Sequence, residues 1–273
     1  NKDVLADAGL EEPKPGSEWT WDDYAVWATE AASAIEGIIP IYNTWDSMYA
    51  VESLMQAWGG ARFLDDTGET CLVDQSNQSS CLKFFAQSVE DGWNARTSEL
   101  GSFHRDLFQG GTIALITDFW PVVGNVKNNP DVTFEVGAVV HPQGPGPDGK
   151  NGGSANMHFF GVSGNSEQPE AAWEYVKYYC GPESSEPLWE LGAPLPIKSV
   201  WSGKWIEDPL TAEVHATLDS IDPPMLPHNF RSNEVGDAYS QNISAVIEGG
   251  MSIEDGIDAV KAAVDAVLAK PEL

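Results

Sequence analysis

Two side chains that could take part in binding lie at the end of an apolar run. The run 110–117 begins with two glycines and predicts a buried strand, and Asp118 and Trp120 follow it. A tryptophan face packs well against C–H groups, and a carboxylate accepts hydrogen bonds from two neighbouring hydroxyls. The pair therefore suits a compound that carries both features. A core tryptophan and a helix-capping aspartate are the alternative interpretations.

The sequence lacks several motifs that mark catalytic sites. It has no GxSxG elbow, no HExxH pair and no P-loop, and its five histidines show no metal-ligand spacing. A glycoside hydrolase needs two carboxylates that face each other across a sugar, and so acidic a chain offers many accidental pairs. We therefore expect that the protein is not an enzyme and uses no cofactor and no metal. A glycoside hydrolase or another carbohydrate-active enzyme is the alternative.

The chain is strongly acidic. Its 273 residues include 42 Asp and Glu against 14 Lys and Arg, which gives a formal net charge of −28. Such a surface repels phosphate backbones and anionic membranes, so we expect no nucleic-acid partner. No run of about 18 or more apolar residues occurs, so no membrane-spanning helix is predicted. Residues 1–5 match neither a signal peptide nor a lipid-attachment segment.

Two of the three cysteines bracket a polar stretch, 72–80, that predicts a loop. In an oxidising compartment, Cys71 and Cys81 would close a small disulfide loop worth about 2–3 kcal/mol on the chain-entropy model, and we expect this bond. Cys180 stands at a predicted helix end without an evident partner. We expect it to be buried as a small apolar residue.

Hydrophobic periodicity predicts alternating strands and helices around these side chains. Thr20 fits a helix N-cap, because acidic residues follow it and Tyr24, Trp27 and Ala31 share one face. Short apolar runs predict strands at 37–42, 110–117 and 134–140. Further helices are expected at 45–58, 81–91, 103–109, 169–179, 209–218, 235–248 and 253–269. The alternation indicates an α/β fold class.

The order of several motifs resembles one known family. The opening NKDVLADAGL (1–10), followed by Pro13 and TWDDY (20–24), resembles the YNKDLFKEAGL…P.TWDEF segment of the maltose-binding-protein-like extracellular solute-binding proteins (family 1). Later segments stand in the order of their counterparts in that family: QGGTIALITDFW (109–120), NSEQPEAAWEYVKYY (165–179), LPIKSV (195–200) and EGGMSIEDGI (248–257). The resemblance covers essentially the whole chain.

The resemblance implies a two-lobed, periplasmic-binding-protein-like (type II) α/β fold with hinge-crossing strands. Residues 1–140 would form the first part of the C-terminal lobe, and 141–197 would return to the N-terminal lobe. Residues 198–273 would supply the last helices of the C-terminal lobe. Members of the family have a further part of the N-terminal lobe ahead of the region that matches 1–10, so we expect this lobe to be incomplete in the chain.

The resemblance also implies a function. Such proteins are substrate-binding receptors of ABC transporters, which capture a sugar in the cleft between the lobes and deliver it to the membrane permease. The sugar would be a mono- or oligosaccharide. We expect an extracytoplasmic protein, in the periplasm or as a cell-surface lipoprotein, and a monomer. A receptor for a polyol, a glycerophosphodiester or an amino acid is the alternative.

The ligand contacts implied by the resemblance come from four segments. The tryptophan that matches Trp120 stacks on the sugar, and Asp118 shares its turn. A scarce arginine, Arg231, would fork onto vicinal hydroxyls or a carboxylate, with a salt bridge as the alternative. Glycines would let backbone amides approach the ligand, with a role in the hinge as the alternative. The other expected contacts are Trp45, Asp46, Ser47, Tyr49, Gly152, Gly153, Ser154, His228 and Asn229, with Phe103 and His104 as further candidates.

Overall fold

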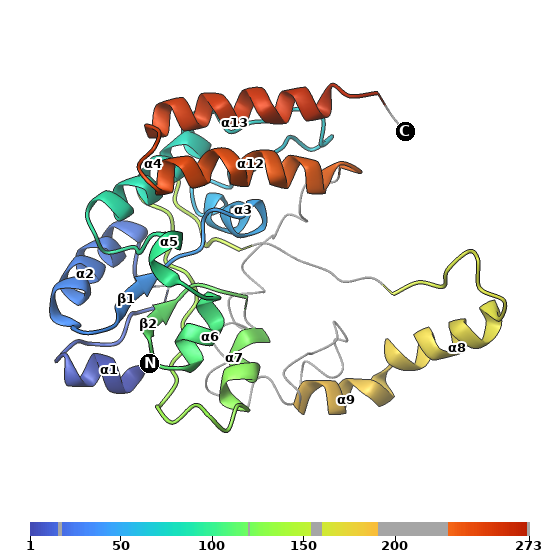
Figure 1. Cartoon of the computed structure of the whole chain (residues 1–273), viewed down its shortest axis with the longest axis horizontal. Helices are drawn as coiled ribbons and strands as arrows, with labels where there is room; N and C mark the ends of the chain where they lie inside the picture. The colour runs from blue at the N-terminus through green and yellow to red at the C-terminus, as the bar shows by residue number, and fades with distance from the viewer. Residues whose placement is uncertain (16–17, 120, 154–159, 191–228, 272–273) are drawn as a thin grey trace.

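The computed structural model of the chain describes residues 1–15, 18–119, 121–153, 160–190 and 229–271. Figure 1 shows a main body that contains both strands and most of the helices, while two helices, α8 and α9, lie apart from it. The predicted α/β class is confirmed. Among the described helices, none is both long and apolar enough to cross a membrane. The helix predicted at 209–218 lies outside the described residues.

Two helices precede the first strand. α1 (Lys2–Asp7) is followed by α2 (Trp21–Ala34), which begins after Thr20 as predicted. The Thr20 hydroxyl accepts from the Asp23 N–H at 3.2 Å, and the Asp23 carboxylate accepts from the Thr20 N–H at 2.9 Å. This capping box satisfies two backbone donors at the helix start. One face of α2 is buried, and β1 (Ile39–Tyr42) follows it.

The described sheet consists of two parallel strands, β1 and β2 (Ile113–Ile116), whose register pairs Ile41 with Leu115. Because parallel strands have their carboxyl ends at the same edge, the segments that follow them are neighbours. Just beyond the strands, the Thr44 N–H donates to Thr117 Oγ1 at 3.2 Å. The fold thereby brings together the polar residues that follow each strand.

The strand predicted at 134–140 is absent, because this described segment is irregular and belongs to no sheet. Its apolar side chains are packed nonetheless. The ring of Phe134 meets that of Phe108 edge to face, with 5.5 Å between centroids, and Val136 packs against the same cluster. An apolar run indicates burial, but a strand also needs a neighbour with which to form a hydrogen-bond ladder.

Helices pack around the sheet and share its core. Their bounds are α3 (Met48–Met55), α4 (Ser76–Glu90), α5 (Thr97–Leu100), α6 (His104–Gln109), α7 (Pro121–Lys127), α12 (Ser232–Ile247) and α13 (Ile253–Leu268). The adjacent helices α12 and α13 cover α3 and α4 (Figure 1). The helices predicted in these regions are confirmed, although α4 begins five residues earlier than expected and α3 is three residues shorter at each end.

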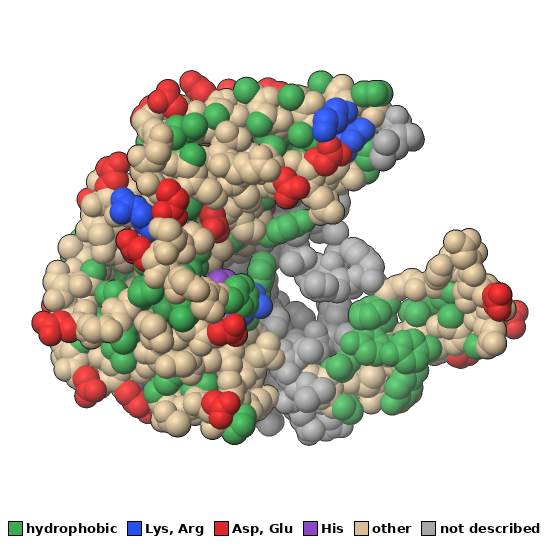
Figure 2. Space-filling view, viewed as in Figure 1, with side chains coloured by type: hydrophobic (Ala, Val, Ile, Leu, Met, Phe, Trp, Pro, Cys, Tyr) green, Lys and Arg blue, Asp and Glu red, His purple; other side chains and the backbone are tan. Residues whose placement is uncertain are grey.

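α8 (Pro169–Tyr179) and α9 (Pro182–Glu190) form a separate helical pair. α8 begins at its proline, as predicted, because the missing N–H costs nothing in the first turn. Trp173, Tyr175 and Tyr178 of α8 are exposed, and Figure 2 shows hydrophobic groups gathered on this pair. The pair falls within 141–197, and the assignment of that segment to the N-terminal lobe stays a prediction.

The predicted disulfide is wrong for this structure, in which Cys71 and Cys81 are free and buried. Cys71 forms an isolated β-bridge with Leu64, and Cys81 lies inside α4 and belongs to the core. Burial raises the pKa of the Cys71 thiol to about 11 and that of Cys81 well above its usual range. Cys180 is exposed, not buried, because it caps the end of α8.

Candidate functional site

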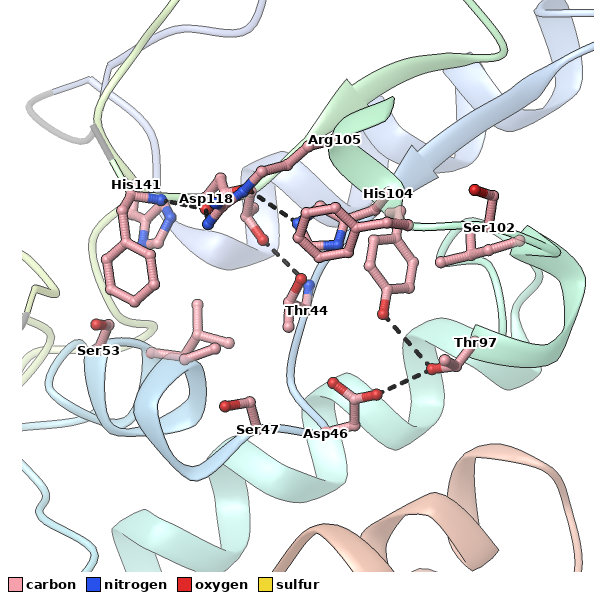
Figure 3. Close-up of a pocket in the computed structure, with 17 residues that line it drawn as sticks. Thr44, Asp46, Ser47, Ser53, Thr97, Ser102, His104, Arg105, Asp118 and His141 are labelled. Carbon is pink, nitrogen blue, oxygen red and sulfur yellow. Dashed lines mark hydrogen bonds and ion pairs between the residues drawn. The ribbon is translucent and has the colours of Figure 1, made fainter. Parts of the chain in front are cut away.

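A cavity of about 400 Å³ opens where the two strands end. Its walls come from the last residue of β1 and from Thr44, Asp46 and Ser47 after it, from one face of α3, from α5 and the start of α6, from 117–119 after β2, and from His141. Figure 3 shows polar side chains from these separate parts of the fold around one space. The carboxyl ends of parallel strands are common ligand sites in α/β proteins. This cavity is therefore the candidate site.

The Asp118 carboxylate is the centre of a hydrogen-bond cluster on one wall. Arg105 donates to it with two groups, Nε to Oδ2 at 2.5 Å and Nη2 to Oδ1 at 2.6 Å. His104 Nε2 lies 2.9 Å from Oδ2, and the Phe119 backbone N–H donates to Oδ1 at 2.7 Å. The Asp118 side chain is only 7% exposed. The bidentate pair fixes the guanidinium in one orientation.

Charges within this cluster compensate one another. Burial by itself would raise the pKa of Asp118, but hydrogen bonds from His104, Arg105 and the Phe119 backbone lower it below its usual value. The hydrogen bond to Asp118 in turn raises the pKa of Arg105. Both groups are thus ionised at neutral pH. The wall presents a guanidinium with a matching carboxylate behind it, and the pair has no net charge.

Aromatic rings stand beside this ion pair. Phe103 is 52% exposed and Phe119 is 37% exposed, and both line the cavity. The Arg105 guanidinium carbon lies 5.3 Å from the centroid of the Phe103 ring, a cation–π contact. The cavity therefore offers phenyl surfaces next to hydrogen-bond donors.

A second polar group comes from residues after β1 and in α5. Thr97 Oγ1 donates to Asp46 Oδ2 at 3.1 Å, and the Tyr42 hydroxyl lies 3.5 Å from Thr97 Oγ1. Ser47 lines the same cavity (Figure 3). Among the described residues, Asp46 accepts this one side-chain hydrogen bond, so its remaining acceptor positions can receive hydroxyl groups.

His141 closes the inner side of the cavity. Burial lowers its pKa to about 4, so the imidazole is neutral at neutral pH. Its ring centroid lies 5.9 Å from that of Trp21 in the core. The same residue borders a second cavity of about 300 Å³, which lies between β2 and the segment 136–142. Among the described residues, no group of three or more potential metal ligands comes together.

The structure brings together some of the predicted contacts and leaves others outside its described residues. Predicted residues that line the cavity are Asp118, Asp46, Ser47, Phe103 and His104. Predicted residues outside the described parts are Trp120, Ser154 and His228. The roles of those three stay predictions.

Trp45 and Tyr49 are not cavity residues, which corrects the expectation that they line the cleft. Trp45 is 2% exposed and stacks with Phe85 at 6.3 Å between ring centroids. Its carbonyl accepts from the Tyr239 hydroxyl at 2.6 Å. Tyr49 is partly buried and packs against the same core. Both aromatic side chains anchor α3 to the core, while their neighbours Asp46 and Ser47 face the cavity.

Asn229 and Arg231 make contacts within the protein, and their expected ligand contacts stay predictions. The Asn229 amide donates to the Gly68 carbonyl at 2.8 Å. Arg231 is 8% exposed, pairs with Glu234 at 2.7 Å and donates to the Pro271 carbonyl at 2.5 Å. Neither side chain lines the cavity. Arg231 thus ties the C-terminal residues to the start of α12.

Gly152 allows the backbone to pack closely against α3. A Cβ atom at Gly152 would lie 2.9 Å from the Ser53 carbonyl oxygen, so only glycine allows this approach to α3. Gly152 and Gly153 border the second cavity and not the site. The turn 144–149 has GxGxxG spacing, but the described residues that follow it, 150–153, form an isolated bridge at Asn151 and not the start of a helix that would bind pyrophosphate.

Sequence reasoning missed most of the side chains that line the cavity, among them Arg105, Thr97 and His141. Arg105 directly follows the candidates Phe103 and His104, and the scarcity of cations in the chain is a signal that could have identified it. Thr97 and His141 carry no comparable local signal. They reach the cavity only because α5 and the irregular segment after α7 pack beside the strand ends.

Comparisons with solved structures show the same fold. The chain aligns with an ABC substrate-binding protein from Listeria monocytogenes in complex with cycloalternan at a TM-score of 0.78 and 16% identity, covering 98% of this chain and 68% of that chain. The cyclic alpha-maltosyl-1,6-maltose binding protein from Arthrobacter globiformis aligns at a TM-score of 0.72 and 22% identity, covering 98% of this chain and 68% of that chain. UgpB from Mycobacterium tuberculosis in complex with glycerophosphocholine aligns at a TM-score of 0.74 and 16% identity, covering 98% of this chain and 67% of that chain. No curated protein matches the chain.

These neighbours are two-lobed type II periplasmic binding proteins, which confirms the predicted fold class. The sequence pattern that defines bacterial extracellular solute-binding proteins matches residues 1–186, more than half of the chain. The resemblance found from the sequence motifs is thereby confirmed as well. The chain belongs to the family of bacterial extracellular solute-binding proteins.

Proposed function

We propose that this protein is the substrate-binding receptor of an ABC transporter that captures a sugar and delivers it unchanged to a membrane permease. The binding site is the cavity at the strand ends. Segments 1–140 and 198–273 form one lobe, 141–197 belongs to the other, and closure of the lobes encloses the sugar. The receptor acts outside the cytoplasm as a monomer, in the periplasm or as a cell-surface lipoprotein.

The combination of groups in the cavity is the observation that carries this proposal. A sugar presents several hydroxyls and a patch of C–H on its ring faces. The exposed rings of Phe103 and Phe119 suit the C–H patches, and Asp46 has acceptor capacity for hydroxyls. Three of the structural neighbours bind a sugar or sugar oligomer according to their descriptions: cycloalternan, cyclic maltosyl-maltose and maltose.

A glycerophosphodiester receptor is the second candidate, because a neighbour with a comparable TM-score was solved with glycerophosphocholine. The charges in the cavity favour the sugar. Arg105 is already neutralised by Asp118, and Asp46 adds an anionic group that a phosphate would have to approach. A neutral ligand meets no such repulsion.

Isothermal titration calorimetry and tryptophan fluorescence test the proposal with maltose, maltotriose, D-mannitol, glycerophosphocholine and glycine as probes. We expect saturable binding of at least one sugar and no product by chromatography. Phe103→Ala should weaken that binding about 5- to 10-fold, since an aromatic contact of this kind is worth about 1 kcal/mol. Phe230→Ala removes another exposed phenyl ring, which does not line the cavity, and is the matched control.

The outcomes separate the candidates. If glycerophosphocholine is the one probe that binds, the ligand is a phosphodiester and not a sugar. Hydrolysis of a probe would support an enzyme instead. Equal effects of the two phenylalanine substitutions would show that the cavity is not the binding site.

A further inference from the structure

We infer that Arg105 makes the direct contact with the solute and that Asp118 does not touch the solute but positions Arg105. The inference rests on the proposed function, since it names the group in the cavity that recognises the sugar. It also changes the role expected from the sequence, in which Asp118 itself binds the hydroxyls.

Asp118 has no free acceptor position for a ligand. A carboxylate offers about four lone-pair positions, two on each oxygen. In the structure, Oδ2 faces Arg105 Nε and His104 Nε2, while Oδ1 accepts from Arg105 Nη2 and the Phe119 N–H, all at 2.5–2.9 Å. All four positions are therefore used within the protein. The 7% exposure of the side chain leaves little room for approach.

Arg105 is in the opposite situation. Its guanidinium group has five N–H donors, of which two bond to Asp118. Among the described residues, no acceptor is recorded for the other three. The side chain is 32% exposed at the cavity, against 7% for Asp118 behind it. Figure 3 shows both residues in the same wall.

Two neighbours hold Arg105 in its binding orientation. Asp118 fixes the plane of the guanidinium through the bidentate pair, and the Phe103 ring lies 5.3 Å from its central carbon. A long side chain that is already ordered loses less conformational freedom when a ligand binds. Because the pair is neutral overall, its free N–H groups suit uncharged hydroxyl oxygens. Removal of the Asp118 carboxylate should therefore weaken solute binding only because Arg105 loses its fixed orientation.

A double-mutant cycle distinguishes positioning from direct contact. Arg105→Gln, Asp118→Asn and the double variant are titrated by calorimetry with the tightest-binding sugar of the probe set above. We expect Arg105→Gln to raise Kd about 10- to 100-fold, as hydrogen bonds from a charged donor are worth about 1.5–3 kcal/mol. Asp118→Asn alone should raise Kd about 5- to 10-fold through the loss of positioning, and Asp118→Glu should restore part of the affinity. In the Arg105→Gln background, Asp118→Asn should change Kd less than about 2-fold.

Controls keep folding and binding apart. Asp66→Asn removes the carboxylate of another Arg–Asp pair, with Arg62, outside the cavity, and should leave Kd unchanged. Circular dichroism and the melting temperature check that each variant is folded. An equal loss from Asp118→Asn in both backgrounds would show direct contact and overturn the inference, as would unchanged affinity of Arg105→Gln. Failure of the unsubstituted protein to bind any sugar would instead refute the proposed function.

Discussion

Glu52 should make this protein less stable as the pH rises from 4.5 to about 7. It lies in α3, the helix that also contributes to the cavity wall, and its side chain is 1% exposed. Oε2 accepts from the Phe63 N–H at 2.7 Å, whereas Oε1 is buried without a hydrogen-bond partner, and Arg62 Nε is 4.0 Å away. Burial raises the pKa of Glu52 from 4.5 to about 7, although the Phe63 hydrogen bond and Arg62 oppose this.

The sign and size of the effect follow from this pKa. The folded state binds the proton more tightly than the unfolded state, so protonation of Glu52 favours folding. Its contribution is complete below pH 4.5, falls as the pH rises to about 7, and is constant above that value. A pKa difference of about 2.5 corresponds to about 3 kcal/mol. The neutral variant Glu52→Gln lacks this titration.

Urea unfolding at intervals between pH 4.5 and 8 measures the prediction. The free energy of unfolding of Glu52→Gln, relative to the unsubstituted protein, should increase by about 3 kcal/mol across this interval. Any constant cost from the altered hydrogen bonds cancels in the comparison across pH. Glu36→Gln, at an exposed position, is the control. Parallel stability curves for Glu52→Gln and the unsubstituted protein would refute the reasoning.

Two further predictions concern the core. Tyr239→Phe removes the hydroxyl that bonds to the buried Trp45 carbonyl, and should lower the free energy of unfolding by about 1–2 kcal/mol in urea titrations; no change would mean that water replaces the hydroxyl. Of the three thiols, only Cys180 should react rapidly with Ellman's reagent in the folded protein, because Cys71 and Cys81 are buried and their pKa values are raised. Rapid release of more than one equivalent would contradict their burial.

The sequence predicted those features that depend on local chemistry. The start of α2 was predictable because Thr20 and Asp23 form a cap within four residues, and β2 because a short apolar run after two glycines is typical of a buried strand. The position of Asp118 at a strand end was predictable for the same reason. The strand expected at 134–140 was not formed, since pairing depends on a neighbour elsewhere in the chain.

The role of each side chain was harder to predict than its position. Trp45 and Asp46 are adjacent in the sequence, yet one is a core residue and the other faces the cavity. The bidentate partner of Asp118 lies 13 residues away on α6, and only the packing of α6 against β2 brings them together. No local pattern distinguishes a carboxylate that is free to bind from one whose acceptor positions are filled.

The pairing of charges inside the cavity and the acidity of the whole chain both disfavour an anionic ligand. A net charge of −28 creates a negative potential that disfavours the approach of anions at low salt. A receptor for anions in such a protein would need an unpaired cation in its site, but Arg105 is paired with Asp118. A neutral sugar is insensitive to the surrounding potential and needs only directional donors, acceptors and ring faces. Arg105, Asp46 and Phe103 together supply a donor, an acceptor and a ring face of this kind.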